Sequence, residues 1–162
     1  QIIHRIRAFV KRSEPQRQSA DARDIIDDAV ELANIDLRRR RVQLNTYLAQ
    51  RLPSLYCDPI LIEQVVLNLV KNAAEAIDLA DMPAARRRIE LRVVPRLQDQ
   101  QEPIVEFSIT DNGPGMSEEV LGRIYEAFFS TKREGLGIGL SLCRSIIESH
   151  RGRLTAENLY NG

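Results

Sequence analysis

Two asparagines lie one turn apart in a predicted helix that is otherwise mostly apolar. Asn68 and Asn72 share a narrow polar arc of that helix with Gln64, Lys71 and Glu75. A solvated arc ordinarily uses Glu, Lys, Gln or Arg, because an asparagine inside a helix costs roughly a few tenths of a kcal/mol more than these residues. The two asparagines are therefore better explained by something that they contact. An amide oxygen is a neutral, hard ligand that suits Mg²⁺ carrying its own waters and phosphates.

A second polar cluster follows a predicted strand, in the stretch SITDNGPGM at residues 108–116. The strand ends at Asp111, and Gly113 and Gly115 come directly after it. These are also ordinary turn residues, so a plain turn is one interpretation. The functional interpretation is that Asp111 accepts a hydrogen bond from an exocyclic amine, while the two glycines allow a flat ring to lie close.

A third cluster is the glycine-rich stretch EGLGIGL at residues 134–140, with Gly135, Gly137 and Gly139 at every second position. A P-loop needs GxxxxGK[ST], which this stretch lacks. A dinucleotide-binding loop needs GxGxxG directly after a buried strand, and Leu140 stands in place of its last glycine. The glycines nevertheless lead into an apolar helix, whose first amides are available to an anion.

The elements that must position these clusters alternate between helical and extended patterns. A helix capped by Ser19 or Asp21 is expected to run to about Arg40. Further helices are expected over residues 58–79 and 140–150, with a short one after Ser117, and strands over residues 42–48, 52–57, 87–97, 103–111 and 152–160. Most strands follow one another without an intervening helix. The predicted fold is therefore α+β, a two-layer sandwich in which helices cover one face of a mixed sheet.

The overall composition narrows the classes of function. Lys+Arg and Asp+Glu number 23 each, so the chain lacks the excess of basic residues expected of a general nucleic-acid or membrane-surface binder. Two arginine runs, at residues 38–41 and 86–88, are expected to be solvated charge. Cys57 and Cys143 are isolated, which argues against metal or redox chemistry through sulfur and fits a reducing, cytoplasmic compartment.

Four motifs occur in one order: NLVKNAAEA at 68–76, DNGPGM at 111–116, Phe128 and Phe129 followed by STK, and GLGIGL at 135–140. Together they resemble the catalytic ATP-binding domain of bacterial sensor histidine kinases, in the gyrase, Hsp90, histidine kinase and MutL ATPase superfamily. The resemblance spans about residues 20 to 160 and is strongest to the nitrogen-regulation and oxygen-sensor branch. It implies a Bergerat-type fold over residues 21–162 with the last strand cut short, a linker over 14–20, and the end of a dimerisation helical hairpin over 1–13.

The resemblance also implies roles for individual residues. Asn72 is expected to coordinate Mg²⁺, with Asn68 as a second candidate ligand near the phosphates, and Asp111 to bind the adenine amine. Catalytic roles are implied for Asn68, Lys71 and Lys132. The expected ATP-binding set is Asn72, Asp111, Gly113, Gly115, Phe129, Thr131, Lys132, Arg133, Gly135, Gly137, Gly139 and Leu140, with Phe128 beside Phe129 as an anchor of the lid.

Some positions depart from the family pattern. Glu75 stands where many members have a lysine, and Lys71 is a candidate for the compensating charge. Asn68 stands where hydrolysing relatives have a glutamate that activates water, so slow hydrolysis is expected. Neither His4 nor His150 is followed by the Glu and Pro that mark the family's phosphoacceptor, so the acceptor is expected outside this chain.

The implied function is transfer of the γ-phosphoryl group of Mg-ATP to a histidine on a separate helical hairpin of a homodimer, for relay to a response regulator receiver domain. No contact with nucleic acid or directly with a membrane is expected. Two alternatives stay open: an ATP-hydrolysing conformational switch of the same superfamily, and a degenerate module used only for protein contacts.

Overall fold

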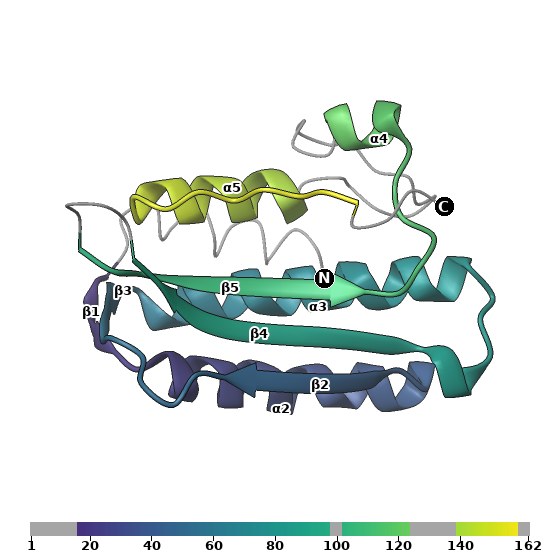
Figure 1. Cartoon of the computed structure of the whole chain (residues 1–162), viewed down its shortest axis with the longest axis horizontal. Helices are drawn as coiled ribbons and strands as arrows, with labels where there is room; N and C mark the ends of the chain where they lie inside the picture. The colour runs from purple at the N-terminus through teal and green to yellow at the C-terminus, as the bar shows by residue number, and fades with distance from the viewer. Residues whose placement is uncertain (1–15, 98–101, 124–138, 159–162) are drawn as a thin grey trace.

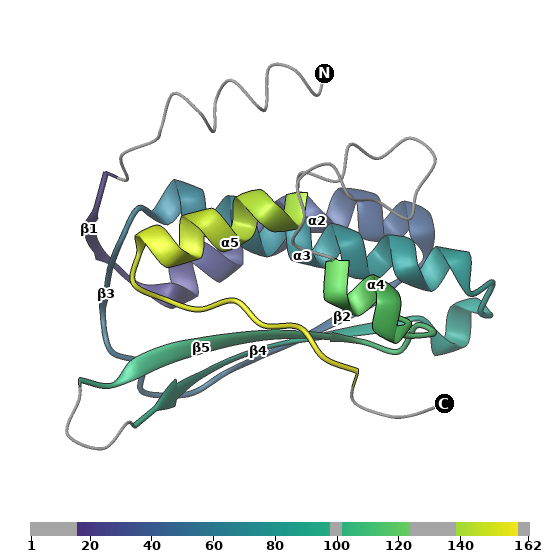
Figure 2. The same cartoon turned by 90° about the horizontal axis from the view of Figure 1, so that it is seen from above.

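The computed structural model describes residues 16–97, 102–123 and 139–158, and shows two layers, one of helices and one of strands (Figure 1). Strands β2 (Gln43–Leu48), β4 (Arg88–Arg96) and β5 (Ile104–Asp111) form a sheet in the order β2-β4-β5. The β2–β4 pair is parallel and the β4–β5 pair antiparallel. Helices α2 (Ala22–Arg40), α3 (Pro59–Leu79) and α5 (Gly139–Ser149) lie on one side of this sheet (Figure 2). The predicted α+β sandwich with a mixed sheet is confirmed.

Local signals explain where the two long helices begin. Asp21 caps α2 by accepting a hydrogen bond from the Arg23 amide at 2.9 Å, which settles the choice between Ser19 and Asp21. Asp58 caps α3 by accepting from the amides of Ile60 and Leu61, and Pro59 occupies the first turn.

The core lies between the helices and the inner face of the sheet. Ile89, Leu91 and Val93 alternate with exposed residues along β4 and are fully buried. They pack with the apolar faces of α2 and α3, which include Ile26 and Ile77. The period of two in β4 and the helical period in α3 therefore place both elements as the sequence predicted.

Two predictions about irregular segments were wrong. Residues 18–20, expected within a polar linker, form strand β1 (Gln18–Ala20), which pairs antiparallel with β3 (Leu55–Cys57). Residues 152–158, expected to begin a strand, carry no strand assignment, and only Leu154 among them is partly buried. A strand requires a ladder partner as well as a suitable local pattern, and the pattern alone does not reveal the partner.

Three further features complete the description. A 3₁₀ turn, η1 (Ala84–Arg86), precedes β4, and a short helix, α4 (Glu118–Arg123), follows the loop after β5. Among the helices in the described residues, none has both the length and the apolar character needed to cross a membrane.

Candidate nucleotide-binding site

The polar arc of α3 is in contact with the rest of the protein. Helix α3 packs against both α2 and α5. Asn68 and Asn72 are half-buried, whereas Lys71 is exposed. The Asn68 side-chain amide donates to the Cys143 thiol of α5 at 3.8 Å. Asn68 therefore faces a neighbouring helix, as the cost of a mid-helix asparagine had suggested.

Asp111 is held at the end of β5 by a local turn. Its Oδ1 accepts a hydrogen bond from the Gly113 amide at 2.8 Å, and the side chain is half-buried. A Cβ atom on Gly113 would lie 2.9 Å from that Oδ1 and 3.5 Å from the Ala76 carbonyl of α3. The loop therefore rests on α3 one turn beyond Asn72. Asp111 and the asparagine arc are brought to the same part of the molecule.

Gly115 has a different reason to be glycine. Its φ is +79°, a conformation that residues with a side chain rarely adopt, and a Cβ there would lie 3.0 Å from the Asn158 Oδ1. The Asn158 side chain in turn accepts from the Met116 amide at 3.0 Å and donates to the Met116 carbonyl. The segment after α5 thus braces the far end of the Asp111 loop, a contact for which the sequence carried no signal.

Helix α5 places its first turn beside α3. It begins at Gly139, and Cys143, four residues later, contacts Asn68. The first amides of a helix have no partner within it and carry a partial positive charge, so this turn can accept a phosphate. Gly139 and Leu140 are therefore placed near the asparagine arc. The remaining predicted ligands, Phe128, Phe129, Thr131, Lys132, Arg133, Gly135 and Gly137, lie outside the described residues.

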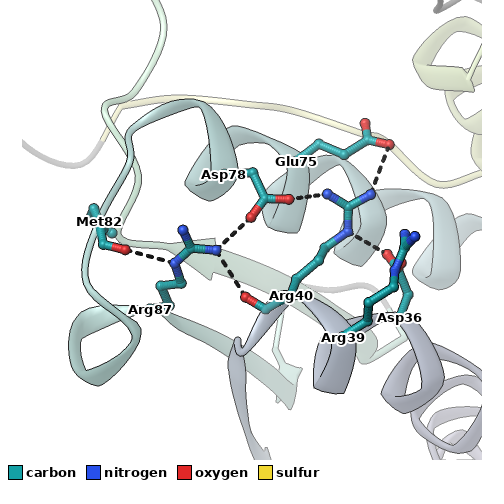
Figure 3. Close-up of polar contacts among 7 residues, drawn as sticks. All are labelled: Asp36, Arg39, Arg40, Glu75, Asp78, Met82 and Arg87. Atoms are coloured by element: carbon teal, nitrogen blue, oxygen red, sulfur yellow. Dashed lines mark hydrogen bonds and ion pairs between the residues drawn. The ribbon is translucent and has the colours of Figure 1, made fainter.

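The charge of Glu75 is balanced from α2. The Arg40 Nη2 lies 4.0 Å from the Glu75 Oε1, and both side chains are less than a fifth exposed (Figure 3). Lys71, which the sequence offered as a compensating charge on the polar arc, is exposed. The contact between Arg40 and Glu75 corrects the prediction that the arginine runs are only solvated charge. Arg40 and Arg87 are half-buried and ion-paired, whereas their neighbours Arg38, Arg39, Arg41, Arg86 and Arg88 are exposed.

The two cysteines and His150 serve the fold. Burial raises the pKa of Cys143 to about 11, and the Asn68 contact lowers it only in part, so the thiol stays protonated and unreactive at neutral pH. Cys57 is also a free, buried thiol, and burial raises its pKa. The His150 Nε2 accepts from the Asp58 amide at 3.0 Å, and its Nδ1 lies 2.7 Å from the Ile146 carbonyl. His150 thus ties the end of α5 to the start of α3, as expected of a packing histidine.

The residues present fit an adenine nucleotide. Gly113 places backbone without a side chain beside Asp111, and the arc of α3 carries the side-chain amides of Asn68 and Asn72. Among the described residues, no three His, Cys, Asp or Glu side chains gather in a metal-binding cluster. The side-chain amide oxygens of Asn68 and Asn72 and the oxygens of a phosphate are ligands that Mg²⁺ accepts.

Comparison with known proteins gives consistent results. A family model described as histidine kinase-, DNA gyrase B-, and HSP90-like ATPase matches residues 57–162. The chain is 35% identical over 95% of its length to the C4-dicarboxylate transport sensor protein DctS of Rhodobacter capsulatus, of which it covers 22%. It is 35% identical over its whole length to the sensor protein FixL of Bradyrhizobium diazoefficiens, of which it covers 30%. The chain thus spans less than a third of the length of these relatives.

A solved structure shows the same fold. The catalytic domain of the histidine kinase ThkA, in a nucleotide-free form, superposes with a TM-score of 0.64 at 26% identity, covering 83% of this chain and 82% of that one. The motifs on α3 and after β5, the shared architecture and the family match agree, and this chain therefore belongs to the histidine kinase-, DNA gyrase B- and HSP90-like ATPase family.

Proposed function

We propose that this chain is the catalytic domain of a sensor histidine kinase, which binds Mg-ATP and transfers its γ-phosphoryl group to a histidine on a separate helical hairpin. The observation that carries the proposal is the placement of the Asp111 loop on α3, where Gly113 lies against the Ala76 backbone one turn from Asn72. The sensor proteins among the relatives support the kinase assignment.

Asp111 selects the base in this proposal. The Gly113 amide occupies one position on Oδ1, and the carboxylate keeps further lone pairs with which to accept from the exocyclic amine of adenine. The orientation is set before the nucleotide arrives, so little ordering is needed on binding.

The α3 arc and the start of α5 serve the phosphates. Asn72 would hold Mg²⁺, with Asn68 beside it, and the ion would supply neutralisation of the phosphate charge. The amides at Gly139 and Leu140 add partial positive charge. An amide at position 68 cannot accept a proton from water, so the γ-phosphate is kept for the acceptor histidine instead of being hydrolysed.

The partners of the reaction follow from the same assignment. The acceptor hairpin belongs to the full-length protein, which we propose to be a homodimer, and the phosphoryl group passes on to a response regulator receiver domain. We place this domain in the cytoplasm, where ATP is available. Lys71 of α3, together with Lys132 and the other lid residues named from the sequence, is retained as a proposed phosphate contact.

Calorimetric titration with ATP, with and without Mg²⁺, tests the proposal. We expect binding that strengthens with Mg²⁺ and is lost in Asp111→Asn, whose amide would present donors toward the amine. Asp27→Asn, which changes an exposed carboxylate on α2, is the matched control and should bind as the parent does. Transfer of ³²P from ATP to a separately supplied acceptor hairpin then tests the kinase activity.

Other results would favour the alternatives. Sustained ATP turnover by this chain alone would favour a hydrolysing switch. Absence of nucleotide binding by the folded chain would favour a module used for protein contacts.

A further inference from the structure

Arg87 joins the ends of two helices to the start of β4 (Figure 3). Its Nη1 lies 2.6 Å from the Asp78 Oδ1 near the end of α3 and donates to the Arg40 carbonyl at the end of α2, at 2.9 Å. Its Nε donates to the Met82 carbonyl at 2.8 Å. Arg40 is bonded to the other Asp78 oxygen, so one carboxylate bridges both guanidinium groups. The position of Arg87 is therefore determined from three sides.

The backbone on either side of Arg87 holds Asn112. The Asn112 side chain donates to the Arg86 carbonyl and accepts from the Arg88 amide at 3.1 Å. Its own amide donates to the Arg88 carbonyl at 3.3 Å. Asn112 thus makes three hydrogen bonds to the backbone of Arg86 and Arg88. Between these two residues lies Arg87, whose side chain is held by α2 and α3.

Asn112 lies between Asp111 and Gly113, the two residues that form the base-binding turn. The β4–β5 ladder ends at the pair Ile89 and Asp111. The Asn112 bonds continue this pairing by one residue past the end of the strand. Without them, Asp111 would be the last restrained residue of β5, and its turn could move relative to α3.

We propose that Asn112 and Arg87 are positioning residues that hold the Asp111 carboxylate in register with α3 for recognition of the exocyclic amine of the base. This inference rests on the proposed function. A hydrogen bond weakens steeply when its distance or angle departs from the optimum, so a small displacement of Asp111 is enough to lose discrimination.

The surroundings of Arg87 favour a brace over a binding site for an anion. A hollow of about 590 Å³ is lined by Arg39, Arg40, Arg41, Asp78, Met82, Ala84 and Arg87. The two half-buried guanidinium groups among these residues, those of Arg40 and Arg87, already have carboxylate partners, as does the exposed Arg39. Most of the positive charge that lines this hollow is therefore neutralised by carboxylates of the protein itself.

The test compares nucleotides that differ at the atom read by Asp111. Inosine triphosphate carries an oxygen where ATP carries the amine, so the ratio of the two dissociation constants reports on Asp111. We expect Asn112→Ala and Arg87→Met to weaken Mg-ATP binding by roughly ten-fold, the usual cost of one hydrogen bond to a charged group. Binding of Mg-inosine triphosphate should change less than about two-fold by the same reasoning, so the ratio collapses toward one.

Matched controls change the same residue types elsewhere. Asn45→Ala replaces an exposed asparagine of β2, and Arg96→Met removes an exposed ion pair at the other end of β4. Both should keep the parental ratio. Arg87→Lys keeps a cation for Asp78 but loses the planar fork that serves three acceptors, and it should show the same change as Arg87→Met. Circular dichroism melting verifies that each titration is made on folded protein.

The outcomes separate this inference from the proposed function. Equal weakening of both nucleotides in the Asn112 and Arg87 variants would show a purely structural role and overturn the inference alone. The inference alone would also be overturned if Asn112→Ala kept the parental ratio of the two dissociation constants while Asp111→Asn brought that ratio to one. If the parent chain did not prefer ATP to inosine triphosphate, both the base assignment and the inference would be overturned. The same would follow if Asp111→Asn left the ratio of the two dissociation constants unchanged.

Discussion

Replacement of Gly113 by alanine should separate nucleotide binding from folding. The added Cβ would lie 2.9 Å from the Asp111 Oδ1, closer than carbon and oxygen tolerate, but at an ordinary contact distance of 3.5 Å from the Ala76 backbone. Helix α3 therefore need not move. The carboxylate must turn away, and the hydrogen bond from the Gly113 amide is weakened with it.

The magnitude follows from the bond that would be lost to the base. A hydrogen bond to a charged acceptor contributes about 1.5–3 kcal/mol, which corresponds to roughly ten- to a hundred-fold in the dissociation constant of ATP. The loop is partly exposed, so the melting temperature should fall by only a few degrees, as for a loss of about 1 kcal/mol or less.

Calorimetric titration with Mg-ATP and thermal melting measure the two effects. Gly122→Ala is the control, because a Cβ at that position of α4 meets nothing within 4 Å, and its ATP affinity should equal that of the parent. If Gly113→Ala bound ATP as tightly as Gly122→Ala, Asp111 would not be the group that reads the base, and the placement of the site would be wrong.

Three further predictions concern stability. Arg151 lies two residues after the end of α5 and has a φ of 62°; its amide donates to the Glu148 carbonyl, and the Gly152 amide donates to the Ile147 carbonyl. Arg151→Gly should therefore raise the free energy of unfolding by about 1 kcal/mol in urea titrations, and Arg153→Gly should not. Leu91→Ala, which removes a fully buried side chain from β4, should lower the free energy of unfolding by about 2–5 kcal/mol by the same measurement, and a loss under 1 kcal/mol would contradict the described core. Burial raises the pKa of Cys143 from 9.0 to about 11, so the folded state binds a proton more tightly than the unfolded state. Its contribution to stability should be complete below pH 9 and be lost as the pH rises toward 11, and Cys143→Ala should remove that part of the alkaline slope in melting experiments.

The long elements could be predicted because their signals are local. Asp58 and Pro59 mark the start of α3, and the alternation along residues 88–96 marks β4, without reference to the rest of the chain. Asn68 and Asn72 were found in the same way, because asparagine inside a helix is costly unless it contacts something. Asp111 is also an ordinary turn residue, and its role came from the resemblance carried by the ordered motifs.

The errors arose where a residue's environment depends on distant segments. Arg40 and Arg87 were predicted to be solvated because each lies in an arginine run, yet both form ion pairs with Asp78. Strand β1 was missed because Gln18, Ser19 and Ala20 include none of the β-branched or aromatic residues typical of strands, and its partner β3 lies more than thirty residues away in the sequence.

The amino-acid sequence by itself indicated candidate residues for the chemistry and determined which elements carry them, because hydrophobic period, caps and turn residues act within a few positions of the chain. Only the tertiary structure decided that Gly113 rests on Ala76, that Asn68 faces Cys143, and that Asn112 is bonded on both sides of Arg87. Each of these contacts joins residues 24 to 75 positions apart or crosses between layers. They exist because α3 packs against α2, α5 and β5 at once, which no local pattern specifies.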